Sequence, residues 1–249
     1  MWIQESMKRG IKMKDQFTLN DVTVIIKDKL PDNVDPDFVF NYVNARVPFY
    51  LTKNIEMIYI GMFPEMKERD IDAFFENDAI YVTNEQSNEM DMIEDLIHEI
   101  SHAIEQYNQE FIYGNGALQR EFIAKRKRLS GLLSQKFTVP ADFNINFEYD
   151  RAIDEFLFRD VGYDVLNQVC VGLFPSAYAA TSISEYWALG FEELFIGDKD
   201  RLRNLCPVLY RTLITLLKEL EEETWQTSSN VLHYIEEELW QNNTFHIQS

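Results

Sequence analysis

The sequence predicts an α+β protein with a small mixed-sheet N-terminal lobe, about residues 15–107, and a mainly helical C-terminal lobe, about residues 108–245. Short β-branched runs occur only in the first half, whereas the second half carries apolar residues three and four positions apart. No internal repeat and no Pro/Gly/Ser-rich linker separates the halves. We therefore predict a single domain over residues 1–249, in which two lobes meet at a cleft around one central helix.

The first half alternates predicted strands and helices. The strands are expected at residues 21–27, 55–60 and 79–83, where β-branched and aromatic residues are dense. Asp35 followed by Pro36 is typical of a helix start, and this helix should reach about Ala45. Residues 64–75 show helical spacing, and residues 88–107 form one long amphipathic helix.

The second half is predicted to be almost entirely helical. The expected helices cover residues 118–133, 149–169, 182–195, 207–223 and 229–240. A short break is expected at residues 138–140, where Pro140 follows two β-branched residues.

Charge excludes several classes of function. The chain carries 23 Lys and Arg against 42 Asp and Glu, which gives a formal net charge of −19. Such a charge repels nucleic acid and anionic membranes and favours a basic peptide or protein partner. The one basic run, residues 125–128, is expected to be the solvated side of a helix.

Compartment signals are few. No secretory signal and no apolar run long enough to cross a membrane is found. These absences predict a cytoplasmic protein, or one delivered by a non-classical route as a toxin or virion component. Cys170 and Cys206 are expected to be inert core thiols, although one disulfide between them stays open.

The chemistry is concentrated in His98-Glu99-Ile100-Ser101-His102, an H-E-x-x-H motif. Residues four apart on a helix lie one above the other, so both imidazoles can reach a single Zn²⁺. Glu99 can then take a proton from the attacking water and pass it to a leaving amine. The alternative is two histidines that merely decorate a solvated helix face.

The surrounding helix favours the metal interpretation. At 100° per residue, six apolar side chains form one stripe, and the two histidines fall on nearly the opposite side. The stripe consists of Ile93, Leu96, Ile97, Ile100, Ala103 and Ile104.

The third ligand is not given by the motif itself. The metzincin continuation is absent, because Glu105 and Asn108 stand where its glycine and third histidine belong, and His233 and His246 are near the C-terminus. Glu185 is the better candidate, with Glu192 or Glu193 as alternatives two turns further along the same helix. Ser182-x-x-Glu185 is also a capping box, which could occupy the carboxylate instead.

These residues carry a family resemblance. His98-Glu99-x-x-His102, followed by Tyr178-x6-Glu185-Tyr186-Trp187-Ala188, resembles the gluzincin metallopeptidases and is similar to the catalytic domain of anthrax lethal factor and its relatives. Cys206-Pro207-Val208-Leu209-Tyr210 also resembles the element behind that family's ligand helix. The resemblance covers about residues 75–220.

The resemblance implies a zincin-like fold, the zinc ligands His98, His102 and Glu185, the general base Glu99, and Tyr178 as an oxyanion donor. One departure is Leu189, which stands where the family often has a second glutamate, so the carboxylate that holds a ligating histidine must come from elsewhere. In this architecture residues 79–84 would be an edge strand along the cleft, although an ordinary buried strand is equally compatible. Tyr178 could also be an ordinary core ring.

The leading expectation is therefore a zinc-dependent endopeptidase acting on a protein or peptide substrate. A catalytically silent protein of the same fold, such as a toxin subunit or virion component, is the alternative. Hydrolysis of a non-peptide amide also stays open.

Overall fold

A five-stranded mixed sheet forms the N-terminal lobe. The structure is a computed structural model that describes residues 16–244, with side chains for residues 17–227. The strands are β1 (Gln16–Leu19), β2 (Val22–Ile26), β3 (Met57–Ile60), β4 (Ala73–Glu76) and β5 (Ala79–Val82). They lie in the order β1-β2-β3-β5-β4, with β2, β3 and β5 parallel and the two outer strands antiparallel to their neighbours. The predicted α+β class and mixed sheet are confirmed.

Helices make up most of the remaining chain. The α-helices are α2 (Pro36–Asn44), α3 (Pro64–Arg69), α4 (Glu89–Tyr107), α5 (Gln109–Tyr113), α6 (Ala117–Leu133), α7 (Arg151–Glu155), α8 (Tyr163–Val169), α9 (Ile183–Phe195), α10 (Lys199–Leu205) and α11 (Pro207–Thr244). Shorter turns are η1 (Phe49–Leu51), η2 (Ala141–Asn144), the π-helical η3 (Phe156–Val161) and η4 (Tyr178–Ala180). Asp35, Asn88 and Ser182 are N-caps whose side chains accept backbone N–H groups of the first turn.

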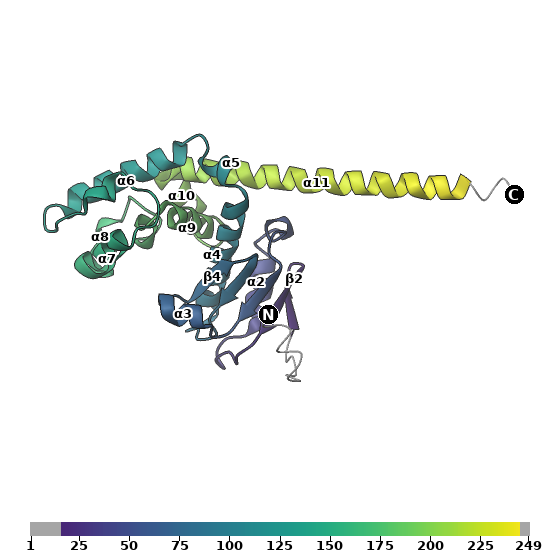
Figure 1. Ribbon diagram of the computed structural model, residues 1–249, viewed down its shortest axis with the longest axis horizontal. Helices are drawn as coiled ribbons and strands as arrows, with labels where there is room; N and C mark the ends of the chain where they lie inside the picture. The colour runs from purple at the N-terminus through teal and green to yellow at the C-terminus, as the bar shows by residue number, and fades with distance from the viewer. Residues whose placement is uncertain (1–15, 245–249) are drawn as a thin grey trace.

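Helix α4 joins the two lobes. It packs against β4, β5 and α2 and also against α9 of the helical lobe, and Figure 1 shows it between the sheet and the helices. All six residues of the predicted apolar stripe are buried, with at most 4% of any of them exposed. Because that stripe packs on the sheet, the opposite side of α4 is left to face α9.

The prediction of one helix over residues 64–75 is wrong for the second half of this segment. Asp70 adopts φ 55°, a left-handed conformation that ends α3 after Arg69. The chain then reverses, and β4 pairs antiparallel with β5, with Phe74 opposite Tyr81. The spacing of residues 64–75 is compatible with a helix or with a strand, and it predicts a helix. Because the chain turns at Asp70, residues 73–76 form a strand instead.

Of the two alternatives for residues 79–84, the edge strand is wrong and the ordinary buried strand is confirmed for β5. It hydrogen-bonds to β3 on one side and to β4 on the other. The edge of the sheet beside β5 is β4. β4, which the sequence did not predict, therefore occupies the edge position that was one of the two alternatives for residues 79–84.

The predicted helix over residues 149–169 is broken. Gly162 has φ 79°, which L-residues rarely adopt, so η3 ends there and α8 begins at the next residue. In contrast, the two helices predicted at 207–223 and 229–240 are one helix, α11, which extends well beyond the rest of the protein (Figure 1).

The basic run on α6 is not simply solvated. Lys125 is 8% exposed and Arg126 is fully buried. Lys125 Nζ donates to the carbonyls of Leu173 and Leu205 at 2.7 Å. Arg126 donates to carbonyls of residues 143, 146, 180 and 181. Only Lys127 and Arg128 of this run are exposed, so half of the run is structural.

Two further expectations concern thiols and membranes. Cys170 and Cys206 are both free and buried, so no disulfide joins them. Within residues 16–244, no helix combines the length and the apolar character needed to cross a bilayer.

Candidate metal centre

The two histidines of the motif face away from the sheet, one turn apart on α4. The Nε2 atoms of His98 and His102 lie 3.1 Å from each other. Their side chains are about one-fifth exposed. The predicted helix period thus brings both rings to one point on the side of α4 that faces α9.

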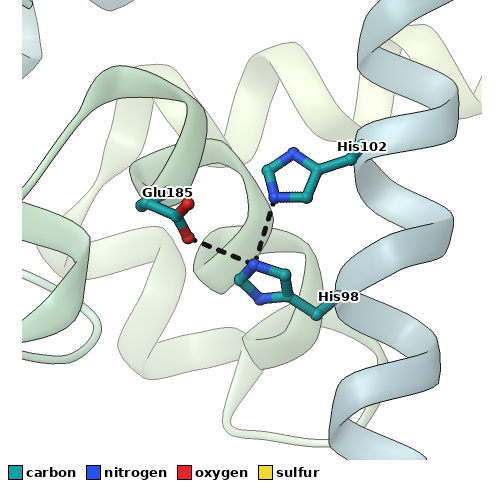
Figure 2. Close-up of side chains that lie close together, drawn as sticks. All are labelled: His98, His102 and Glu185. Carbon is teal, nitrogen blue, oxygen red and sulfur yellow. Dashed lines mark hydrogen bonds and ion pairs between the residues drawn. The ribbon is translucent and has the colours of Figure 1, made fainter. Parts of the chain in front are cut away.

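Glu185 reaches the same point from the first turn of α9. Its Oε2 lies 3.1 Å from His98 Nε2, and Figure 2 shows the carboxylate opposite the two imidazoles. One nitrogen of each ring and one oxygen of Glu185 all lie within 4.8 Å of one another. The three predicted ligands are brought together.

Only one of the two hydrogen bonds of a capping box forms between Ser182 and Glu185. Ser182 Oγ accepts the backbone N–H of Glu185 at 3.1 Å, as a capping box requires. The carboxylate of Glu185, however, turns to His98, and its buried Oε2 lies 3.1 Å from His98 Nε2.

The alternative ligands lie elsewhere. Glu192 Oε1 accepts from His98 Nδ1 at 2.5 Å, on the side of the ring opposite Nε2. Glu193 pairs with Arg201 at 2.7 Å. Glu192 therefore orients His98 and supplies the partner that Leu189 cannot, since carboxylates commonly hold a ligating histidine in this way.

His102 is oriented by a second carboxylate, Glu105. Glu105 Oε2 lies 3.1 Å from His102 Nδ1 and accepts from Ser184 Oγ at 2.6 Å, while Oε1 accepts from Tyr113 at 2.5 Å. Burial opposes ionisation of Glu105, but these hydrogen bonds outweigh it and lower its pKa. Glu105 thus joins α4, α5 and α9 behind the histidine that it orients.

The donor set fits a cation. When both rings are neutral, a carboxylate holds the proton on each Nδ1, so the two Nε2 atoms present lone pairs to each other and no hydrogen bond joins them there. Ligands at 2.0–2.1 Å from a tetrahedral zinc lie about 3.3 Å apart, close to the two 3.1 Å separations found here.

Electrostatics agree with this fit. Burial acts to lower the pKa of His98, but hydrogen bonds and charge from Glu185 and Glu192 raise it well above its ordinary value. The same field that attracts a proton attracts a metal ion. Two imidazoles and one carboxylate are a donor set that suits zinc.

Glu99 is buried near this group, within the influence of the charges of His98, His102 and Glu185. It is only 5% exposed, and its carboxylate accepts no hydrogen bond from the residues described. Burial raises the pKa of Glu99, against the opposing charges of His102 and His98. A carboxylate with a raised pKa and no fixed donor is suited to take up and release a proton.

Tyr178 begins η4, seven residues before Glu185. The residue is 39% exposed, and no group in the described part of the chain hydrogen-bonds to its hydroxyl. Burial of the hydroxyl and the negative charge of Glu185 raise the pKa of Tyr178, so it stays protonated. It is therefore a hydrogen-bond donor within the electrostatic range of Glu185, and its oxyanion role stays a prediction.

Asp95 is a half-buried carboxyl group one turn before Glu99. Gln86 Nε2 donates to it at 2.8 Å. Burial raises the pKa of Asp95 to about 6, and the charges of Asp72 and Glu99 add to the rise although Gln86 opposes it.

The remaining histidines do not enter the group. His233 is on α11 in the part whose side chains are not described, and His246 lies outside the described residues.

The comparisons with known proteins give no match for this chain. No protein-family model, no curated protein and no solved structure matches this chain. What can be said of the function therefore comes from the geometry around α4 and α9.

The sequence analysis did not identify the residues that hydrogen-bond to the two histidines or that hold those partners in place. Glu105 carries a signal, because residues three apart on a helix are neighbours. Tyr113, Ser184 and the role of Glu192 carry none, because each depends on how another helix crosses α4.

Proposed function

We propose that this protein is a zinc-dependent endopeptidase with a zincin-like fold. The observation that carries the proposal is the convergence of His98, His102 and Glu185, from two helices, beside the unengaged carboxylate of Glu99. A site that only stabilised the fold would have no use for such a base.

Each residue has a distinct part in the proposed reaction. His98, His102 and Glu185 would hold the zinc, which when bound supplies Lewis-acid activation of the peptide carbonyl and of water. Glu99 accepts the proton of the attacking water and delivers it to the leaving amine. Tyr178 donates a hydrogen bond to the negative charge that develops on the carbonyl oxygen.

The orienting residues support the same function. Glu192 and Glu105 fix the two rings with Nδ1 protonated and Nε2 free. A surface pair of histidines would not require a largely covered carboxylate behind each ring. This distinguishes the proposal from two histidines on a solvated helix face.

The proposal is tested by metal content and turnover in the same preparation. The purified protein should hold about one zinc per chain, and His98→Ala or His102→Ala should abolish this. Glu99→Gln should keep the zinc and lose cleavage of a proteome-derived peptide library, because a neutral amide cannot take the proton. Absence of zinc under metal-replete conditions, or full turnover by Glu99→Gln, would overturn it.

A catalytically silent protein of this fold would give a different result. It would bind zinc and show no cleavage of the library in either the unmodified chain or Glu99→Gln.

A further inference from the structure

Helix α9 carries Glu185 in its first turn and is held in place by the two residues that follow it. Trp187 is fully buried, and its Nε1 donates to the carbonyl of Ser101, within the H-E-x-x-H motif, at 3.1 Å. Tyr186 is also fully buried, and its hydroxyl donates to Glu121 Oε1 at 2.9 Å. The first contact fixes α9 against α4, which carries the two histidines. The second fixes α9 against α6, which carries Glu121.

Glu121 also binds the first turn of α11. Its Oε2 accepts the backbone N–H of Val208 at 2.9 Å, and its Oε1 accepts that of Leu209 at 3.0 Å. The first N–H groups of a helix have no partner within the helix, and an N-cap side chain commonly satisfies them. The residue before α11 is Cys206, whose thiol is a weak acceptor. Glu121 therefore caps α11 from a neighbouring helix.

A carboxylate suits this position better than any neutral side chain. Glu121 is half-buried and makes no ion pair within the part of the chain that the structure describes. The positive end of the α11 dipole lies at the N–H groups that Glu121 binds, so it stabilises the negative charge. Three donors surround its two oxygens. An amide could not serve all three, because its NH₂ group is itself a donor.

α9 and α11 also touch directly. A Cβ atom on Gly190 of α9 would lie 2.4 Å from Leu209 Cδ2, so only glycine fits between the two helices. Leu209 is fully buried, and its N–H is one of the two that Glu121 binds. Packing this close leaves no free space between the helices. A shift of the first turn of α11 would therefore displace α9 with it.

We infer that Glu121 is a positioning residue for the metal centre and that it fixes the carboxylate of Glu185 relative to His98. The connection is the hydrogen bond from Tyr186, the residue next to Glu185. The geometry that depends on it is the 3.1 Å separation of Glu185 Oε2 and His98 Nε2. The inference rests on the proposed function, because it takes Glu185 to be a zinc ligand. It adds a residue outside the metal centre on which the ligand geometry depends.

Zinc affinity tests this inference without turnover. Glu121→Gln should weaken zinc binding about tenfold, the lower end of the range for residues that orient ligands, because the amide cannot accept all three hydrogen bonds. Tyr186→Phe removes only the hydroxyl and should have a similar effect. Because both changes break the same connection, the double variant should bind zinc no more weakly than the weaker of the two single variants.

Two measurements on the full chain give these results. Competition with a chelator of known affinity measures zinc binding. The visible absorption of the cobalt-substituted protein reports the geometry of the ligands, and it should change in both single variants.

Asp35→Ala is the matched control for a role in stability alone. Asp35 caps α2, where it accepts the backbone N–H of Asp37, in the lobe that does not contain α9. Loss of this cap should lower the melting temperature by about a few degrees, as loss of the α11 cap should. Measured well below the melting temperatures, Asp35→Ala should leave zinc affinity and the cobalt spectrum unchanged.

Three results would overturn the inference: unchanged zinc affinity in either single variant, additive losses in the double variant, or an equal loss in Asp35→Ala. If Glu121→Gln does not fold, Tyr186→Phe decides alone, through its zinc affinity and its cobalt spectrum.

Zinc content and cleavage separate this inference from the proposed function. If the unmodified chain holds zinc and cleaves peptides while the Glu121 and Tyr186 variants behave like Asp35→Ala, the positioning role fails and the peptidase proposal stands. If these variants weaken zinc binding as expected but the unmodified chain cleaves no peptide, the peptidase proposal fails and Glu121 still positions a metal ligand.

Discussion

Asp95→Asn should stabilise the metal-free protein at neutral and alkaline pH. The pKa of Asp95 is raised from 3.8 to about 6, mainly because the carboxyl group is buried on α4. A difference of about 2.2 units at ~1.36 kcal/mol per unit corresponds to about 3 kcal/mol. Asparagine resembles the protonated form and can still accept the hydrogen bond from Gln86, so most of this free energy should be recovered.

The sign of the pH dependence follows from the raised pKa. The folded protein binds the Asp95 proton more tightly than the unfolded chain. The stabilisation by this proton is therefore complete below about pH 4 and is lost as pH rises through about 6. The advantage of Asp95→Asn should be absent at pH 4 and reach its full value by about pH 7.

Urea unfolding in the presence of a chelator measures this directly, from the midpoint and slope at several pH values. Asp91→Asn is the control. Its carboxylate lies in the first turn of α4, where negative charge is favourable, so its removal should cost a few tenths of a kcal/mol. If Asp95→Asn has the same stability as the unmodified protein at pH 8, or a lower one, the burial argument is refuted.

Three further predictions concern the metal and the oxyanion. Glu185→Gln should weaken zinc affinity ~10-fold or more and remove one ligand from the X-ray absorption spectrum. Glu192→Gln should weaken affinity within the ~10–100-fold range of orienting partners but keep the ligand count, and a lost ligand in Glu192→Gln alone would reverse the assignment. Tyr178→Phe should keep zinc and slow peptide cleavage by about 10²-fold, and unchanged turnover would exclude Tyr178 as the donor.

The parts of the fold that were predictable depend on local pattern. Helix α4 was placed within one residue of its observed start, because a 3.6-residue period and the N-cap Asn88 mark it independently. The same holds for Asp35 at the start of α2 and Ser182 at the start of α9. Where the period is strong and a cap is present, sequence alone suffices.

The failures come from single residues that redirect the backbone. Asp70 ends α3 and Gly162 separates η3 from α8, each through a positive φ that periodicity does not register. The prediction that Arg126 is solvated was wrong for another reason. A basic run predicts a solvated face. The guanidinium of Arg126 is buried instead, and it donates to four backbone carbonyls from distant parts of the chain.

The candidate site shows the same division. The spacing of His98 and His102 predicts their convergence, because both lie on one helix. Glu185 required a second helix to cross α4 at the right point, and sequence could only rank it above Glu192. Both glutamates do contact His98, at opposite nitrogens of the same ring.

Burial of Arg126 has a consequence for how a substrate could enter. Its guanidinium donates to the carbonyls of Ala180 and Thr181 and lies about 4.8 Å from the ring centres of Phe122 and Phe143. Moving the backbone after Tyr178 would strand a charge in an apolar interior, which costs several kcal/mol. That backbone is therefore a fixed wall rather than a gate. Substrate should meet a Tyr178 segment already in place, and association should be limited by encounter rather than by a slow rearrangement there.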